Sequence, residues 1–167
     1  MHWKRALTHL LATRGDLARA FPPRVLAAIE SAIAETERAH SGEIRFAIET
    51  SLDPVEALKG RRPRERAVQV FAETGTWDTE LNNGVLVYVL LADRAVEIVA
   101  DRGHNDRVAA DEWAAACRAM EAAFREGRYE AGAVEGIRRV GAIVARHYPA
   151  TPGAANPDEL PNRPVLL

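Results

Sequence analysis

The sequence contains few of the features that assign a chain to a functional class at once. Among its 167 residues there is one cysteine, Cys117, which excludes an internal disulfide and a cysteine-rich zinc site and is expected in the core. The longest apolar run, residues 85–92, has the length of a strand and falls short of the ~20 residues of a membrane-spanning helix. P-loop, HExxH and nucleophile-elbow motifs are absent, as is a net positive charge. We therefore expect no transmembrane span, no nucleic-acid partner and no complete catalytic set.

The composition is that of one packed domain with additional segments at both ends. Hydrophobic residues make up 47% of the chain and charged residues 28%, with a net charge of -2. A proline pair at positions 22 and 23 and a tail rich in proline, glycine and asparagine mark the boundaries. We predict an N-terminal amphipathic helix in residues 1–23, an α/β domain in residues 24–148 and an extended tail in residues 149–167, of which 163–167 can pack as a short strand. No signal-peptide cleavage site is recognised, so we expect a cytoplasmic location.

Residues 3–20 place apolar side chains on one side of the predicted N-terminal helix. These side chains are Trp3, Leu7, Leu10, Leu11 and Leu17. One interpretation is that this side docks on the domain or on a second copy of the chain. The other is that the helix lies on a membrane surface, because basic charge combined with tryptophan and leucine suits a lipid interface. In that case the protein is cytoplasmic and peripheral to a membrane.

The rest of the chain alternates between strand and helix patterns. Period-two alternation and continuous apolar runs predict strands at residues 43–50, 85–91 and 95–100. Three- and four-residue apolar spacing predicts helices at residues 24–39, 64–73, 113–124 and 133–144. We therefore predict an α/β fold: a three-layer α/β/α sandwich of Rossmann-like appearance, whose mixed sheet has three to four strands and helices on both faces. Gly132 and Gly136 in the last helix predict a close packing face, since glycine otherwise weakens a helix.

The order of the strands gathers polar residues at one edge of the predicted sheet. A right-handed crossover makes the first two strands parallel, and the third returns beside the second, so the start of strand two meets the end of strand three. The carboxylates and amides at this edge are Asp78, Asn82, Asn83, Asp101, Asp106 and Asp111. Such oxygen ligands suit a hard cation, Ca²⁺ or Mg²⁺, although the same residue types also cap turns and helix starts. His104, which follows the third predicted strand between Asp101 and Asp106, is the candidate proton donor.

A basic run lies at the opposite edge, at the start of the helix over residues 64–73. It contains Arg61, Arg62, Arg64 and Arg66. Positive charge at a helix start opposes the helix dipole, and a phosphate, an acidic partner or an anionic lipid would relieve this. The run is therefore a candidate anion or partner patch. The alternative, which Glu65 and Glu73 favour, is a solvated loop whose charge is offset locally.

Three segments of the chain resemble the TPM domain, a family that includes plant photosystem II repair proteins and many bacterial proteins. Residues 78–86 read D-x-x-x-N-N-G-V-L, residues 93–98 read D-R-x-V-x-I, and residues 124–137 read F-x-x-G-x-x-x-x-G-x-x-x-x-I. Order and spacing agree over residues 24–148. Residues 101–111 depart from the family's usual pattern, because its second glycine and its glutamate are missing.

The resemblance implies an α/β/α sandwich and several kinds of function. Some members are described as acid phosphatases, some bind calcium or other divalent ions, and others are accessory factors for membrane complexes. The motif carries Asp78, Asn82 and Asn83 over as site candidates. Because no complete catalytic set is visible, we expect an accessory or protein-binding module that binds a divalent cation such as calcium. The alternative is a weak metal-assisted acid phosphatase.

Overall fold

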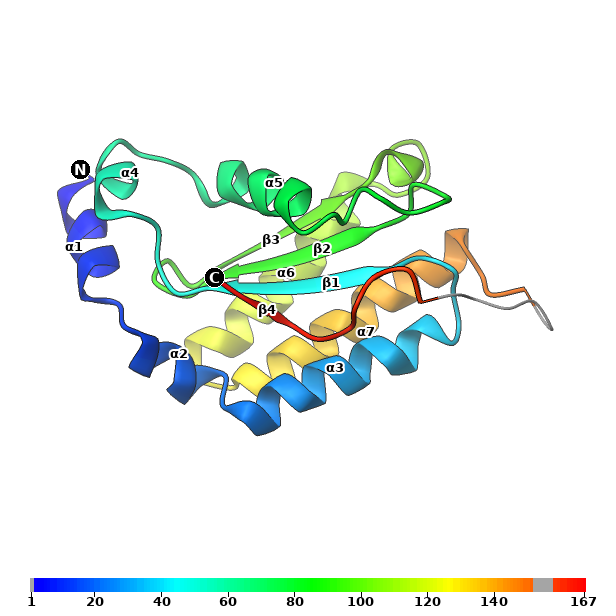
Figure 1. The fold of residues 1–167 in the computed structure, drawn as a ribbon, viewed down its shortest axis with the longest axis horizontal. Helices are drawn as coiled ribbons and strands as arrows, with labels where there is room; N and C mark the ends of the chain where they lie inside the picture. The colour runs from blue at the N-terminus through cyan, green and yellow to red at the C-terminus, as the bar shows by residue number, and fades with distance from the viewer. Residues whose placement is uncertain (1, 152–157) are drawn as a thin grey trace.

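The chain forms a four-stranded open sheet with helices on both faces (Figure 1). The computed structural model describes residues 2–151 and 158–167. The strands are β1 (Ile44–Glu49), β2 (Val85–Leu90), β3 (Ala95–Ala100) and β4 (Val165–Leu166). The helices of the described residues are α1 (Trp3–Leu11), α2 (Arg14–Ala20), α3 (Pro23–Glu37), α4 (Pro54–Leu58), α5 (Pro63–Glu73), α6 (Ala110–Arg125) and α7 (Tyr129–His147), with a short 3-10 helix, η1 (Arg102–His104).

The sheet is mixed, with the strand order β3-β2-β1-β4. β1 lies parallel to β2 and to β4, whereas β2 and β3 are antiparallel neighbours. All six residues of β2 are buried, as its continuous apolar sequence predicts for a strand covered on both faces. β4 is the short strand expected within residues 163–167. The predicted α/β sandwich is therefore confirmed, with four strands.

Separate cores lie on the two faces of the sheet. α3, α6 and α7 cover one face and enclose the alternate side chains of β1, which are Ile44, Phe46 and Ile48. α5 covers the other face through Ala67 and Val70. The apolar spacing of this helix predicts that Ala67, Val68 and Phe71 face inward, but Val68 is exposed, because it lies about 100° around the helix from Ala67.

The N-terminal segment is two helices, so the prediction of one helix over residues 3–20 is wrong. α1 ends at Leu11, and Thr13 starts α2 through a capping box. Thr13 Oγ1 accepts a hydrogen bond from Asp16 N at 3.3 Å, and Asp16 Oδ2 accepts one from Thr13 N at 2.9 Å. A local capping pair therefore breaks a segment whose apolar pattern alone is continuous.

Asp53-Pro54, Gly60 and Pro63 predict a loop over residues 51–63, but the short helix α4 interrupts this stretch. Asp53 caps this short helix, since its Oδ1 accepts a hydrogen bond from Val55 N at 2.8 Å. Pro54 occupies the first turn, where the absence of an amide proton costs nothing. The Asp-Pro pair is thus a helix start here and not merely a turn.

The glycines of α7 form a close packing face, as the sequence predicts. A Cβ atom at Gly132 would lie 2.7 Å from the Cβ of Ala123, and one at Gly136 would lie 2.2 Å from the sulfur of Met120. Both neighbours belong to α6, so the two helices approach at these positions more closely than a side chain allows. This contact holds α7 beneath the sheet.

Substitution of Gly132 by alanine tests this contact. We expect Gly132→Ala to lower the free energy of unfolding by ~1–3 kcal/mol, because the added methyl group must displace α6. Gly15→Ala is the matched control: Gly15 lies in helix α2, and the nearest atom to an added Cβ would be Thr13 Oγ1 at 3.4 Å. Urea denaturation of both variants is the measurement, and equal effects would contradict the close contact.

Candidate functional site

The loop before β2 and the loop after β3 lie against each other at one end of the sheet (at the right in Figure 1). Gly103 N donates a hydrogen bond to Asn82 O at 3.0 Å, and Arg102 Nε donates one to Asn82 Oδ1 at 3.0 Å. His104 Nε2 lies 3.0 Å from Asn83 O. The predicted meeting of these loops is therefore present in the structure.

The Asn-Asn-Gly sequence builds the first of these loops. Asn82 has a left-handed backbone with φ of 52°, a conformation that asparagine tolerates better than most residues. A Cβ atom at Gly84 would lie 2.0 Å from the backbone oxygen of Thr76, so only glycine fits there. Asn83 is fully buried, and its Nδ2 donates to Ser41 O at 3.0 Å. The motif thus ties this loop to the chain that enters β1.

His104 is buried beneath the two loops. It is 1% exposed and lies between the rings of Trp113 and Tyr148, at centroid distances of 5.7 and 5.0 Å. Burial lowers its pKa, so the imidazole is neutral at neutral pH. Because Nε2 must donate its proton to Asn83 O, Nδ1 carries a lone pair. This arrangement favours an acceptor or ligand role over the proton-donor role considered for His104.

Three buried acceptor atoms at this end have no hydrogen-bond partner within residues 2–151 and 158–167. They are Asn83 Oδ1, Asp101 Oδ2 and His104 Nδ1. The other carboxylate oxygen of Asp101 accepts a hydrogen bond from Arg102 N at 2.7 Å. A buried acceptor without a partner costs about 1–3 kcal/mol, so this end of the molecule needs a donor or a cation. The two oxygens suit Ca²⁺ or Mg²⁺, whereas an imidazole nitrogen suits a transition metal.

The remaining predicted ligands lie on the surface or are engaged. Asp78 and Asp106 are exposed on the same two loops. Asp111 is exposed in the first turn of α6, where its charge favours the helix dipole. Asn82 Oδ1 is already bound by Arg102. Among the six, Asn83 and Asp101 are therefore the residues with a buried oxygen that lacks a partner within the described residues, and ion binding by any of the six stays a prediction.

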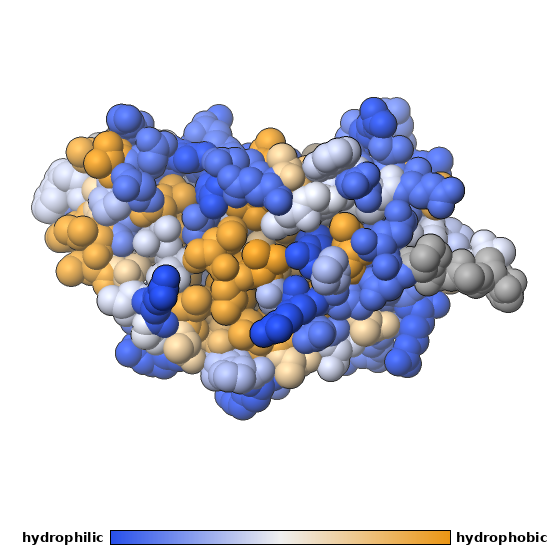
Figure 2. All heavy atoms as spheres, viewed as in Figure 1, coloured by the Kyte–Doolittle hydropathy of each residue, from blue (hydrophilic) through white to orange (hydrophobic). Residues whose placement is uncertain are grey.

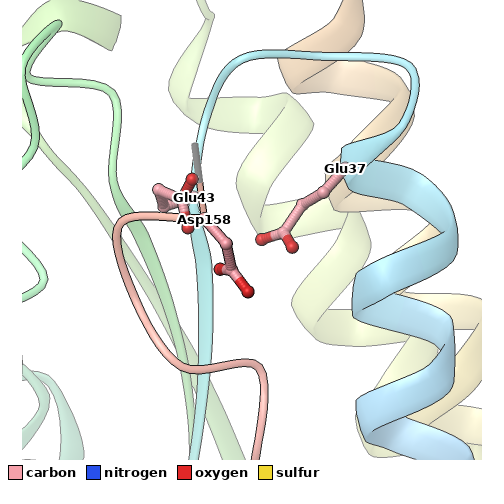
Figure 3. Close-up of side chains that lie close together, drawn as sticks. All are labelled: Glu37, Glu43 and Asp158. Carbon is pink, nitrogen blue, oxygen red and sulfur yellow. The ribbon is translucent and has the colours of Figure 1, made fainter. Parts of the chain in front are cut away.

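An acidic cluster lies beside these loops, at the entry to β1 (Figure 3). Glu37 ends α3, Glu43 precedes β1, and Asp158 comes from the C-terminal segment, with carboxylate oxygens within 4.8 Å of one another. Glu37 Oε1 accepts from Ile44 N at 3.0 Å, and Glu43 Oε2 accepts from Leu160 N at 3.2 Å. The sequence places Glu43 at the start of the first predicted strand but does not reveal the cluster, because only tertiary packing brings Asp158 there.

Protons or a cation must offset the charge of this acidic cluster. Burial raises the pKa of Glu37 to about 8, although the amide of Ile44 acts in the opposite direction, and Glu43 and Asp158 raise it further. Burial also raises the pKa of Glu43. When no cation is bound, the Glu37 carboxyl is therefore largely protonated at neutral pH.

The family model described as the TPM domain matches residues 15–143. The chain belongs to the TPM domain family. The NMR structure of BA42 protein from the psychrophilic bacterium Bizionia argentinensis is similar to it, with 33% sequence identity, a TM-score of 0.74, and coverage of 86% of this chain and 92% of that chain. A search among curated proteins gave no match.

The basic run of this TPM domain is neutralised by its own glutamates. The ion pairs are Arg61–Glu56, Arg62–Glu65, Arg64–Glu97 and Arg66–Glu49, with Glu73 as a second partner of Arg66. Glu49 also accepts a hydrogen bond from the buried Tyr88 hydroxyl at 2.6 Å. This pairing favours the interpretation that the run is a solvated loop whose charge is offset locally. Anion binding there stays a prediction.

Membrane crossing is likewise not indicated for the described residues. No helix of this part of the TPM domain combines the length and the apolar character that a membrane span requires.

Cys117 packs against the core as expected, and burial raises the pKa of its thiol to about 12.

Glu37→Gln tests the account of the acidic cluster. Between pH of about 4.5 and about 8, the folded chain holds a proton on Glu37 that the unfolded chain has released, so the free energy of unfolding falls as pH rises through this window. The raised pKa corresponds to a loss on the order of a few kcal/mol. Glu37→Gln keeps an acceptor for Ile44 N and should remove this pH dependence.

The matched control is Glu30→Gln, at an exposed position of the same helix. It should leave the pH dependence of the wild type unchanged. Denaturation curves at several pH values between 5 and 8 (about one unit apart) are the measurement. The same pH dependence in the wild type and in Glu37→Gln would show that Glu37 is not protonated in the folded chain.

Proposed function

We propose that this TPM domain is a non-enzymatic accessory module that binds a protein partner and holds a divalent cation, Ca²⁺ or Mg²⁺, at the loops before β2 and after β3. The observation that supports this is the set of buried acceptors without partners, Asn83 Oδ1 and Asp101 Oδ2 above all. Both loops are held in place by hydrogen bonds to each other, so the two residues are fixed at the same end of the sheet. A cation there would offset the cost of burying them.

The exposed surface of the same loops supports a partner-binding role. Trp77 and Leu81 lie on the loop before β2 and are 54% and 51% exposed. Large apolar side chains beside a polar rim are typical of protein-binding surfaces, in which tryptophan is frequent. A cation that orders this loop would thereby also order the binding surface.

Phosphatase activity is the alternative that the family resemblance implies. It needs a group that delivers a proton to the leaving oxygen, and His104, the histidine considered for this role, is buried and neutral. The thiol of Cys117 has a raised pKa and packs on the core, so it is a poor nucleophile. These observations favour binding over turnover.

Thermal unfolding with added Ca²⁺, Mg²⁺, Mn²⁺ or Zn²⁺ tests the proposal. We expect one of these ions to raise the Tm in a saturable manner, equivalent to about 2.7 kcal/mol at a hundred times the Kd. Asp101→Asn should abolish the shift, because it removes the charge and keeps the side-chain shape. A phosphate-release assay on p-nitrophenyl phosphate should show no turnover under the same conditions.

Glu43→Gln is the control that separates the two groups of oxygens. It alters the acidic cluster and should retain the ion-dependent shift. If Glu43→Gln loses the shift while Asp101→Asn keeps it, the ion binds the acidic cluster and the proposed site is wrong. Turnover that disappears in Asp101→Asn would instead establish the phosphatase.

A further inference from the structure

Helix α1 turns its polar side toward the domain. Arg5 and His9, one turn apart, both contact Asp93: Arg5 Nη2 lies 2.7 Å from Oδ2, and His9 Nε2 lies 3.1 Å from Oδ1. His9 Nδ1 also accepts a hydrogen bond from Leu52 N at 3.0 Å, and the histidine is buried. Polar contacts therefore hold this helix on the protein.

The apolar side of α1 faces solvent. Its exposed fractions are 60% for Trp3, 46% for Leu7, 65% for Leu10 and 65% for Leu11. These positions follow the spacing of one helix face, which in a globular protein ordinarily meets the core. The orientation is thus the reverse of the usual one, and it corrects the interpretation that this side docks on the domain.

Helix α4, which packs beside α1, extends the same surface. Val55 and Leu58 of α4 are 56% and 52% exposed. Figure 2 shows apolar atoms gathered at this end of the molecule, over α1 and α4. We call these six side chains of α1 and α4 the apolar end. An exposed group of this kind marks an interaction surface.

We propose that the apolar end docks this protein on an anionic membrane surface, with α1 lying in the plane of the lipid headgroups. α1 contains no acidic residue, Lys4 is exposed in its first turn, and Arg14 is exposed at the start of α2. Lys4 Nζ lies 5.7 Å from the centroid of the Trp3 ring, which places charge beside an aromatic residue typical of membrane interfaces. Apolar burial plus attraction to anionic lipid is the combination that holds such helices on membranes.

The charges at α4 are also compatible with an anionic membrane surface. Its acidic residue, Glu56, is offset by Lys59 and Arg61, at 3.7 and 3.5 Å. A second copy of the chain fits less well, because a two-fold interface would place Lys4 and Arg14 of both copies close together. The apolar end lies at the end of β2 opposite the loops proposed to hold a cation, so the two proposals stand independently (Figure 1).

Co-sedimentation with vesicles tests membrane docking. The full chain is mixed with vesicles of phosphatidylcholine alone or with about 30% phosphatidylserine, at low and at high salt. We expect binding to the anionic vesicles that high salt weakens. Leu10→Glu should reduce the partition coefficient by about tenfold or more, because it removes apolar burial and adds a repelled charge.

Val68→Glu is the matched control, at an exposed apolar position of α5. It adds the same charge away from the apolar end and should bind like the wild type. Absence of binding to both kinds of vesicle, or an equal loss in Val68→Glu, would overturn the proposal. Sedimentation equilibrium tests whether a second copy of the chain covers the apolar end instead. If the wild type is a dimer, Leu10→Glu is a monomer and neither binds vesicles, the apolar end is a dimer interface and the proposal is wrong.

Discussion

The antiparallel pairing of β3 with β2 is the constraint that positions the loops before β2 and after β3. Its register pairs Val85 with Ala100, and the ladder continues one step further, where Asp101 N donates to Gly84 O at 2.9 Å. The Asn-Asn-Gly loop and η1 must therefore meet just beyond the strands. Asn83 and His104 are then buried, and burial makes their acceptor atoms costly when these lack a partner. The chemistry of this end follows from strand pairing.

An ionic contact decides the character of the opposite end. Asp93 follows β2 and binds Arg5 and His9, so α1 is held by its polar side and its leucines are turned to solvent. A half-buried carboxylate between two basic side chains is stabilised by both, and the pKa of Asp93 is lowered despite its burial, through Arg5 and His9. Each end of β2 thus carries a different chemistry, one suited to a cation and the other to a lipid surface.

The fold could be predicted from the sequence to a large extent, because its strands and helices have strong periodic patterns. The buried run of β2, the glycine face of α7 and even the strand near the C-terminus were readable. The break between α1 and α2 was not anticipated, since the apolar spacing is continuous and a single capping box at Thr13 overrides it. Periodicity also shows which side chains share a face, but not which face meets the core. That limit explains why the sequence left open whether the leucines of α1 dock on the domain or lie on a membrane surface.

The candidate site was predictable in part. Strand order brings Asn83, Asp101 and His104 to one end, but hydrogen bonds alone decide which atoms are occupied there. The acidic cluster needed Asp158, whose position depends on how the C-terminal segment crosses the sheet. Sequence reasoning therefore identified which loops meet but could not choose among their oxygens, and ion binding at this edge stays a prediction.

Paramagnetic broadening by Mn²⁺ tests the central claim most directly, because it locates an ion without assuming an activity. In a titration followed by amide NMR, the account predicts that the signals of Asn83, Gly84 and Asp101 through His104 broaden first. Broadening confined to Ile44 and Leu160, beside the acidic cluster, would contradict it, as would spectra that Mn²⁺ leaves unchanged.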